Sequence, residues 1–88
     1  MTINNKSTQT VAWLIVQVSG QSLAFSNVLS GASRTTKFAI TNDSCYVITG
    51  AFVNNTPIQG TFGYTTKQPG SEKVRVDLLP DGKIAGFQ

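Results

Sequence analysis

The chain has 88 residues, which is enough for a single domain, and we assign one domain to residues 1–88. Seven Lys and Arg against four Asp and Glu give a formal net charge of +3, but only 12% of the residues are charged, about half the usual share. Such sparse charge disfavours nucleic acid as a partner, and a single cysteine excludes an intrachain disulfide.

Strand and turn signals recur along the chain, whereas the sustained i, i+3, i+4 apolar spacing of a helix is missing. We predict strands over residues 10–18, 22–28, 34–41, 44–53, 58–66, 72–79 and 83–87, with a further short strand at residues 2–4. Turn dipeptides such as Ser19-Gly20 and Asp81-Gly82 separate them. The pattern predicts an all-β fold, a small antiparallel β-sandwich of about seven strands, with a partly open barrel as the alternative.

The first and fourth predicted strands are apolar on both faces. In residues 10–18, one face holds Ala12, Leu14, Val16 and Val18, and the other holds Val11, Trp13 and Ile15. In residues 44–53, one face holds Tyr46, Ile48 and Phe52, and the other holds Cys45, Val47, Ala51 and Val53. A two-layer sandwich buries only one face of each strand, so we expect Trp13, Ile15, Val47 and Val53 to line a shared outer patch.

Two other strands have a simpler pattern. Residues 34–41 are expected to turn Thr36, Phe38 and Ile40 inward. In residues 72–79, apolar and charged residues alternate, which indicates one buried and one wet face; the apolar set is Val74, Val76 and Leu78, and the charged set is Lys73, Arg75 and Asp77.

The strand and turn periodicity resembles that of immunoglobulin-like accessory domains. The segment Ile3-Asn4-Asn5-Lys6-Ser7 precedes the first long strand, and Leu29-Ser30-Gly31-Ala32-Ser33 precedes Phe38. The paired cysteines of antibody-type domains are missing. The resemblance therefore implies a pair of packed sheets and points to no particular family.

An enzyme is disfavoured, because the chain has no histidine to act as a general acid or base or as a metal ligand. We expect Cys45 to be a buried structural thiol. A calcium site is conceivable from the oxygen atoms of Asn42, Asp43, Asn54 and Asn55, but these residue types more commonly form turns. We therefore predict no catalytic residue, no metal and no cofactor.

Aromatic residues suggest two kinds of ligand. Trp13, Tyr46 and Tyr64, combined with Asn54 and Asn55, supply the rings and amides that carbohydrate sites use. The glycine and aromatic alternation of residues 60–65 is typical of strands on which single-stranded nucleic acid stacks, although core packing explains it more simply.

We predict a non-catalytic binding or assembly module that forms a homo-oligomer or docks on a partner protein through the apolar sheet face around Trp13 and Ile15. The alternative is a lectin-like carbohydrate-binding sandwich, with a single-stranded nucleic-acid binder ranked below it. No apolar run approaches the roughly 18 residues of a membrane span. Residues 1–6 lack the order of a secretory signal, so we expect a cytoplasmic protein as written, or a secreted one if a leader was removed.

Overall fold

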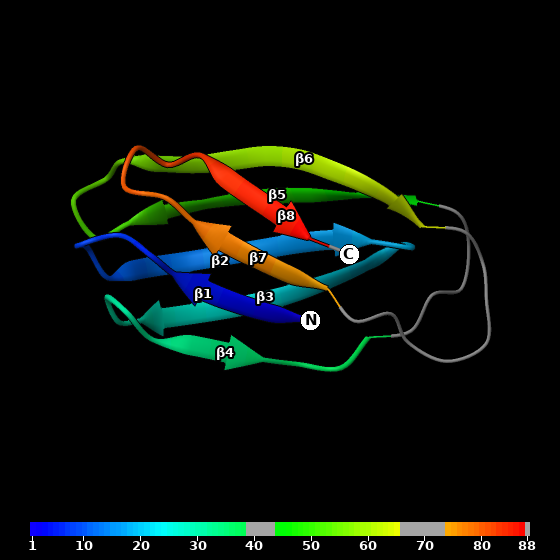
Figure 1. Cartoon of the computed structure of the whole chain (residues 1–88), viewed down its shortest axis with the longest axis horizontal. Coiled ribbons are helices and arrows are strands. Elements are labelled where there is room, and N and C mark those ends of the chain that lie inside the picture. Colours follow the sequence, from blue (N-terminus) through cyan, green and yellow to red (C-terminus); the bar gives the residue numbers. More distant parts are fainter. Residues whose placement is uncertain (39–43, 66–73, 88) are drawn as a thin grey trace.

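In a computed structural model, which describes residues 1–38, 44–65 and 74–87, the chain forms two packed sheets of four strands each (Figure 1). The strands are β1 (Thr2–Asn5), β2 (Val11–Val18), β3 (Gln21–Val28), β4 (Ser33–Thr35), β5 (Ser44–Phe52), β6 (Pro57–Thr65), β7 (Arg75–Leu78) and β8 (Ile84–Phe87). The front sheet in Figure 1 has the order β4-β1-β7-β8, and the back sheet has the order β3-β2-β5-β6. The predicted β-sandwich is confirmed, and the sheets do not close into a barrel.

The strand boundaries agree with the prediction to within a few residues for most elements. The short strand expected at residues 2–4 is a full member of the front sheet, so the described part of the chain holds eight strands rather than seven. β4 ends at Thr35, well before the predicted end at residue 41, and residues 39–41 lie outside the described ranges. β1 also pairs in parallel with β7, from Thr2 beside Arg75 to Asn5 beside Leu78, so the sandwich is not purely antiparallel.

The core lies between the two sheets and contains the inward faces that the alternation predicts. Leu14, Val16 and Val18 of β2 are buried, as are Val76 and Leu78 of β7. The inward residues of β5, which are Tyr46, Ile48 and Phe52, meet them from the neighbouring strand. Of the inward residues predicted for 34–41, Phe38 is buried, Thr36 is half-buried and Ile40 lies outside the described ranges.

The predicted faces of β2 are wrong at its first two residues. Val11 is fully buried and pairs with Phe52, whereas Trp13 pairs with Ala51. Between these two pairs β2 therefore contains one more residue than β5, which is a β-bulge. This bulge absorbs Ala12, which becomes half-buried instead of joining the inward face. A strict period of two cannot anticipate an inserted residue, and the alternation resumes correctly from Trp13.

A buried amide joins the two sheets where the chain leaves β1. The side chain of Asn5 is inaccessible to solvent, and its Nδ2 atom donates to the carbonyls of Gln9 at 2.8 Å and Val28 at 3.0 Å. Its Oδ1 atom accepts from the backbone N–H of Ser7 at 3.1 Å and from the Ser7 hydroxyl at 2.6 Å. All four hydrogen-bonding positions of the amide are filled, so its burial carries no unsatisfied polar atom.

Replacing this amide should destabilise the whole sandwich. We expect Asn5→Ala to lower the free energy of unfolding by about 2–4 kcal/mol, because it removes the hydrogen bonds that the amide makes with the carbonyl of Val28 and the N–H of Ser7 in the protein interior. Urea denaturation followed by circular dichroism measures this change. The neighbouring Asn4→Ala is the control, since Asn4 bonds on the wet face of the front sheet and its loss should cost within about 1 kcal/mol. Equal losses for the two variants would contradict the role given to Asn5.

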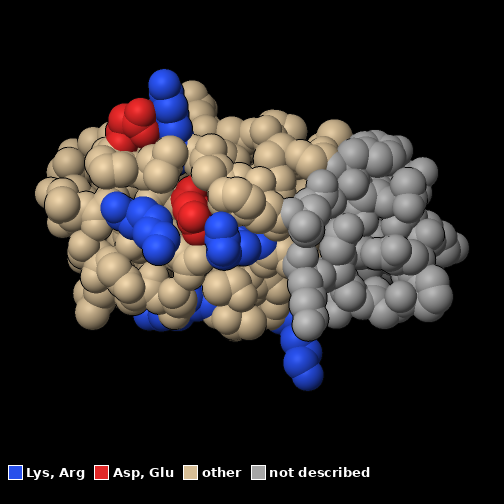
Figure 2. All heavy atoms as spheres, in the orientation of Figure 1, with Lys and Arg blue, Asp and Glu red and all other residues tan. Residues whose placement is uncertain are grey.

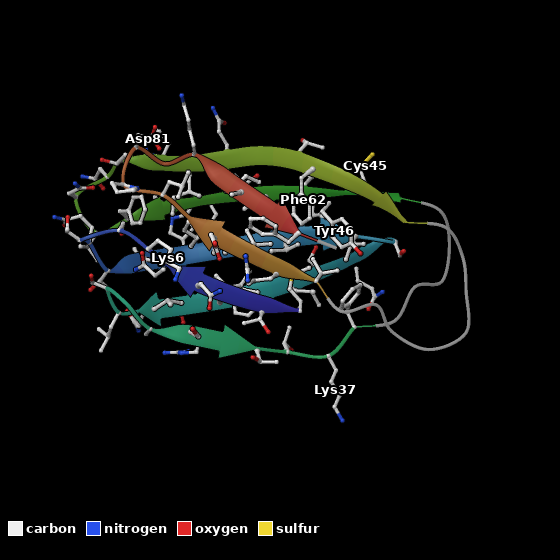
Figure 3. The ribbon with its side chains drawn as sticks, viewed as in Figure 1. Lys6, Lys37, Cys45, Tyr46, Phe62 and Asp81 are labelled. Atoms are coloured by element: carbon white, nitrogen blue, oxygen red, sulfur yellow. The ribbon has the colours of Figure 1, made fainter. Side chains whose placement is uncertain are left out.

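An aromatic stack fills the space between β5, β6 and β8. The rings of Tyr46 and Phe62 lie 4.8 Å apart between centroids with 10° between their planes, and Phe38 meets Tyr46 edge-on at 6.2 Å (Figure 3). Phe62 also lies directly on the backbone of Gly86, where a Cβ atom would overlap the ring. The absence of a side chain at Gly86 therefore lets β8 approach β6 closely enough to cover the stack.

Adding one methyl group at this contact should disturb the stack. We expect Gly86→Ala to cost about 1–3 kcal/mol, because the added methyl group overlaps the Phe62 ring and must displace it from its stacked position on Tyr46. Thermal and urea unfolding measure the loss. In the double variant Gly86→Ala with Phe62→Leu, the smaller side chain makes room for the methyl group, so the combined cost should be less than the sum of the two single costs. Additive costs would show that the two residues do not share a contact.

Candidate functional site

The outer face of the back sheet is formed by side chains in three rows that cross its strands. The rows depend on the register of the strands, which for β2 and β3 is fixed by the two-residue turn between them, where Ser19 and Gly20 both have positive φ. Each row takes one residue from β3, β2, β5 and β6 in turn: Ser26-Trp13-Ala51-Pro57, Ala24-Ile15-Thr49-Gln59 and Ser22-Gln17-Val47-Thr61. None of these residues is charged, and we call this surface the uncharged face.

The middle of the uncharged face is apolar and accessible. Trp13 is 43% exposed and Val47 is 38% exposed, while Ile15 between them is half-buried by its neighbours in the sheet. Val53, which follows β5, is 55% exposed. The four residues predicted to line an outer patch therefore all belong to β2 and β5 or to the turn beside them, and the described segments leave Trp13 open to solvent.

The described charged residues lie outside the three rows of the uncharged face. The described Lys, Arg and Asp residues belong to the front sheet or to the segments that follow its strands, and these are Lys6, Arg34, Lys37, Arg75, Asp77, Asp81 and Lys83. Figure 2 shows several of them on the front-sheet side. The two outer surfaces of the molecule therefore differ in chemical character.

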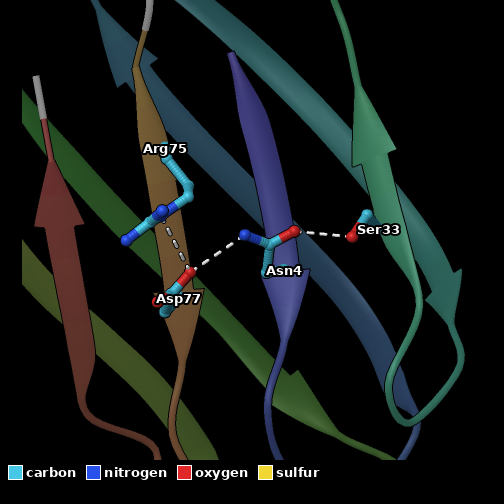
Figure 4. A network of polar contacts seen from close by, with 4 residues as sticks. All are labelled: Asn4, Ser33, Arg75 and Asp77. Carbon is cyan, nitrogen blue, oxygen red and sulfur yellow. Dashed lines mark hydrogen bonds and ion pairs between the residues drawn. The ribbon is translucent and has the colours of Figure 1, made fainter.

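On the front sheet the polar side chains bind one another. The Ser33 hydroxyl donates to Asn4 Oδ1 at 2.5 Å, Asn4 Nδ2 donates to Asp77 Oδ1 at 3.0 Å, and Arg75 Nε lies 3.5 Å from the same carboxylate oxygen (Figure 4). The Arg75 guanidinium also covers the ring of Phe87 at 4.2 Å. Because these groups already have partners across all four strands, the arrangement accounts for the polar front surface without a ligand.

The residues predicted for a carbohydrate site do not form one cluster. Tyr46 is fully buried and stacks on Phe62, on the opposite side of the back sheet from Trp13. The Tyr64 side chain lies outside the described part of the structure. Asn54 and Asn55 occupy the turn between β5 and β6, where Asn54 Oδ1 accepts the N–H of Thr56 at 3.0 Å and Asn55 has a φ of 71°. Both asparagines thus have a role in forming this turn.

The structure also bears on two alternatives that the sequence raised, a nucleic-acid stacking strand at residues 60–65 and a calcium site. Phe62 faces the core and packs on Tyr46, as the simpler interpretation of residues 60–65 proposed. Asn42 and Asp43 lie outside the described ranges. Over the described residues, no group of three or more His, Cys, Asp or Glu side chains comes close enough to hold a metal ion.

The prediction of a buried Cys45 is wrong, because the side chain is exposed (Figure 3). Cys45 precedes the inward-facing Tyr46, and successive residues of a strand point to opposite sides. The apolar character of residues 44–53 suggested burial. This strand is apolar on both faces, however, and only the face that holds Tyr46 points into the core.

Sequence reasoning missed the contribution of β3 and the central position of Asn5. The exposed residues Ser22, Ala24 and Ser26 complete the uncharged face, and their alternation with Leu23 and Phe25 was the available signal. Asn5 looked like an ordinary loop residue in the sequence. The structure shows why an amide is needed at this position: it bonds the backbone at Gln9 and Val28 where the chain passes from the front sheet to the back sheet.

Comparisons with known proteins give no match to a family, to a curated protein or to a solved structure. The described residues also contain no helix that is long and apolar enough to cross a membrane. We therefore infer a function for this chain from the geometry and chemistry of its own surfaces.

The exposure of Cys45 predicts its reactivity. In the folded protein at low concentration, Cys45 should react with a small disulfide reagent at a rate within about tenfold of that in denaturant, because no unfolding is needed to reach it. Absorbance of the released thiolate measures the rate. A reaction slower by several orders of magnitude, tracking global unfolding, would contradict the outward placement of this residue.

Proposed function

We propose that this protein is a non-catalytic binding and assembly module that docks on another protein through the uncharged face. The observation that carries the proposal is the composition of that face, which crosses four strands without a charged residue and exposes Trp13 on the central strand β2. Solvated sheet faces normally carry charged side chains, and this chain places such residues on its front sheet instead.

The arrangement has the anatomy of a protein interface. Interfaces have an apolar middle, in which tryptophan is among the commonest energetic anchors, and a polar rim that excludes water. Here Trp13, Ile15 and Val47 form the middle, and the small hydroxyl side chains of Ser22 and Ser26 form part of the rim. Docking would remove the exposed indole ring from water, which is favourable by about 25 cal/mol per Å² of apolar area.

Carbohydrate binding is the second candidate, and the exposed Trp13 ring is the observation that favours it. A sugar can stack its C–H groups on an indole ring while neighbouring polar groups bind its hydroxyls. The hydroxyl of Ser26 beside Trp13 and the amide of Gln17 on the same face are neutral groups of that kind. A glycan array separates the two functions, since a protein-docking surface should bind no sugar on it.

Photo-crosslinking tests protein docking even when the partner has not been identified. A diazirine-bearing aliphatic residue is placed at position 15 on the uncharged face, or at position 35 on the exposed side of β4 as the matched control. We expect protein adducts from position 15 that are at least about fivefold more abundant than those from position 35. Adding Thr49→Lys beside position 15 should abolish them, because it introduces a charge into the contact.

Electrophoresis and mass spectrometry measure the adducts in the purified protein and in extracts of the source cells. Equal adduct yields from positions 15 and 35, or adducts that persist with Thr49→Lys, would contradict docking through the uncharged face. Circular dichroism of each variant establishes that its sandwich is intact.

A further inference from the structure

We infer that the protein bound by the uncharged face is a second copy of this chain, so that two sandwiches pack back sheet to back sheet around a two-fold axis. This inference rests on the proposed function and specifies its partner. Three properties of the described surface support it: the distribution of charge, the strand order, which lets the face overlap fully with a second copy, and the area of the face.

The charge distribution permits two positively charged chains to associate. Each copy carries a formal net charge of +3, and its described charged groups lie on or beside the front sheet. In the face-to-face arrangement the front sheets are the two outermost of four layers. They are then about 30 Å apart, or three sheet spacings of about 10 Å. Charges at that distance are screened, because the Debye length at physiological ionic strength is about 8 Å.

The absence of charge on the face also narrows the choice of partner. A surface without charged groups offers no electrostatic pattern for a charged partner to recognise, and it would leave charged side chains of that partner desolvated and unpaired. The partner must therefore present a similarly neutral surface. The uncharged face itself is one such surface, and it is present at the same concentration as the chain.

A two-fold axis can pack the uncharged face on itself with all four strands overlapping. When the axis runs parallel to the strands between β2 and β5, β2 of each copy lies over β5 of the other and β3 lies over β6, so both copies make the same contact twice. The apolar side chains of Trp13, Ile15 and Val47, which belong to these two central strands, are then covered together.

The area of the face indicates how stable this dimer can be. Four strands spaced about 4.8 Å apart, with about eight residues of 3.3 Å each, give a face of roughly 19 by 26 Å. Two such faces bury about 1,000 Å² in total, which lies at the lower limit for specific protein interfaces. We therefore expect a reversible dimer that dissociates on dilution into the micromolar range.

Sedimentation velocity of the purified full chain tests the inference. The mass should rise from one chain to two as the concentration increases, and it should stop there because a two-fold contact is closed. The dissociation constant should change by less than about threefold between low and high salt, since no described charge lies in the contact. A mass that stays at one chain up to near-millimolar concentration, growth beyond two chains, or strong weakening by salt would overturn the inference.

Lysine substitutions locate the contact. Thr49→Lys should weaken the dimer at least about tenfold, and because Thr49 is exposed, the fold should be unaffected. Ala24→Lys on β3, which faces outward in the same row as Ile15, should act in the same way. Thr35→Lys adds the same charge to the exposed side of β4 on the front sheet and should leave the dissociation constant unchanged. If Thr35→Lys weakened the dimer as much as Thr49→Lys does, the contact would not be the uncharged face.

The crosslinked adducts from position 15 separate this inference from the proposed function. Adducts with twice the mass of the chain, in purified protein, support the second copy as partner. Adducts formed only with other proteins would overturn the second copy while leaving docking through the uncharged face intact. A glycan on the array together with no protein adduct from position 15 would overturn both.

Discussion

Two packed sheets can hide only one side of each strand, and this constraint governs both the stability and the surface chemistry of the molecule. The inward sides of β2, β5 and β7 supply a core of aliphatic residues with Tyr46 and Phe52, whereas the outward sides must meet water or another surface. The chain satisfies the constraint differently on its two sheets. Its front sheet meets water with Asn4, Asp77 and Arg75, and its back sheet presents the uncharged face.

This division of polar and apolar character depends on the crossing at Asn5. β1 belongs to the front sheet and β2 to the back sheet, so the chain must pass through the margin of the core between them. The fully bonded amide of Asn5 holds that passage in place and ties it to the end of β3 at Val28. The same residue thereby helps to fix the position of the strand that carries Trp13, and the chemistry of the outer surface is linked to a polar group in the interior.

Period-two patterning predicted the strands and most of their inward faces, because alternation is a direct consequence of strand geometry. It was most reliable where apolar and charged residues alternate, as in Val76 and Leu78 beside Arg75. It failed at Val11, where a bulge shifts the phase. It placed Cys45 correctly on the face opposite Tyr46, and the wrong expectation of a buried thiol came from the apolar character of the segment. For the candidate site, the outward positions of Trp13 and Ile15 were predictable from the alternation in their own strand. The neighbours that complete the uncharged face come from β3 and β6. They could not be predicted, because local spacing does not show which strands pair.

The parallel pairing of β1 with β7 has a consequence for the order in which the protein folds. Hairpins such as β2 with β3 join residues that are close in the chain, whereas β1 must wait for residues 75–78 before its parallel partner exists. Closing such a long loop costs entropy early in folding, so strand pairs of this kind form slowly. We therefore expect the β2–β3 and β5–β6 hairpins of the back sheet to form before β1 pairs with β7.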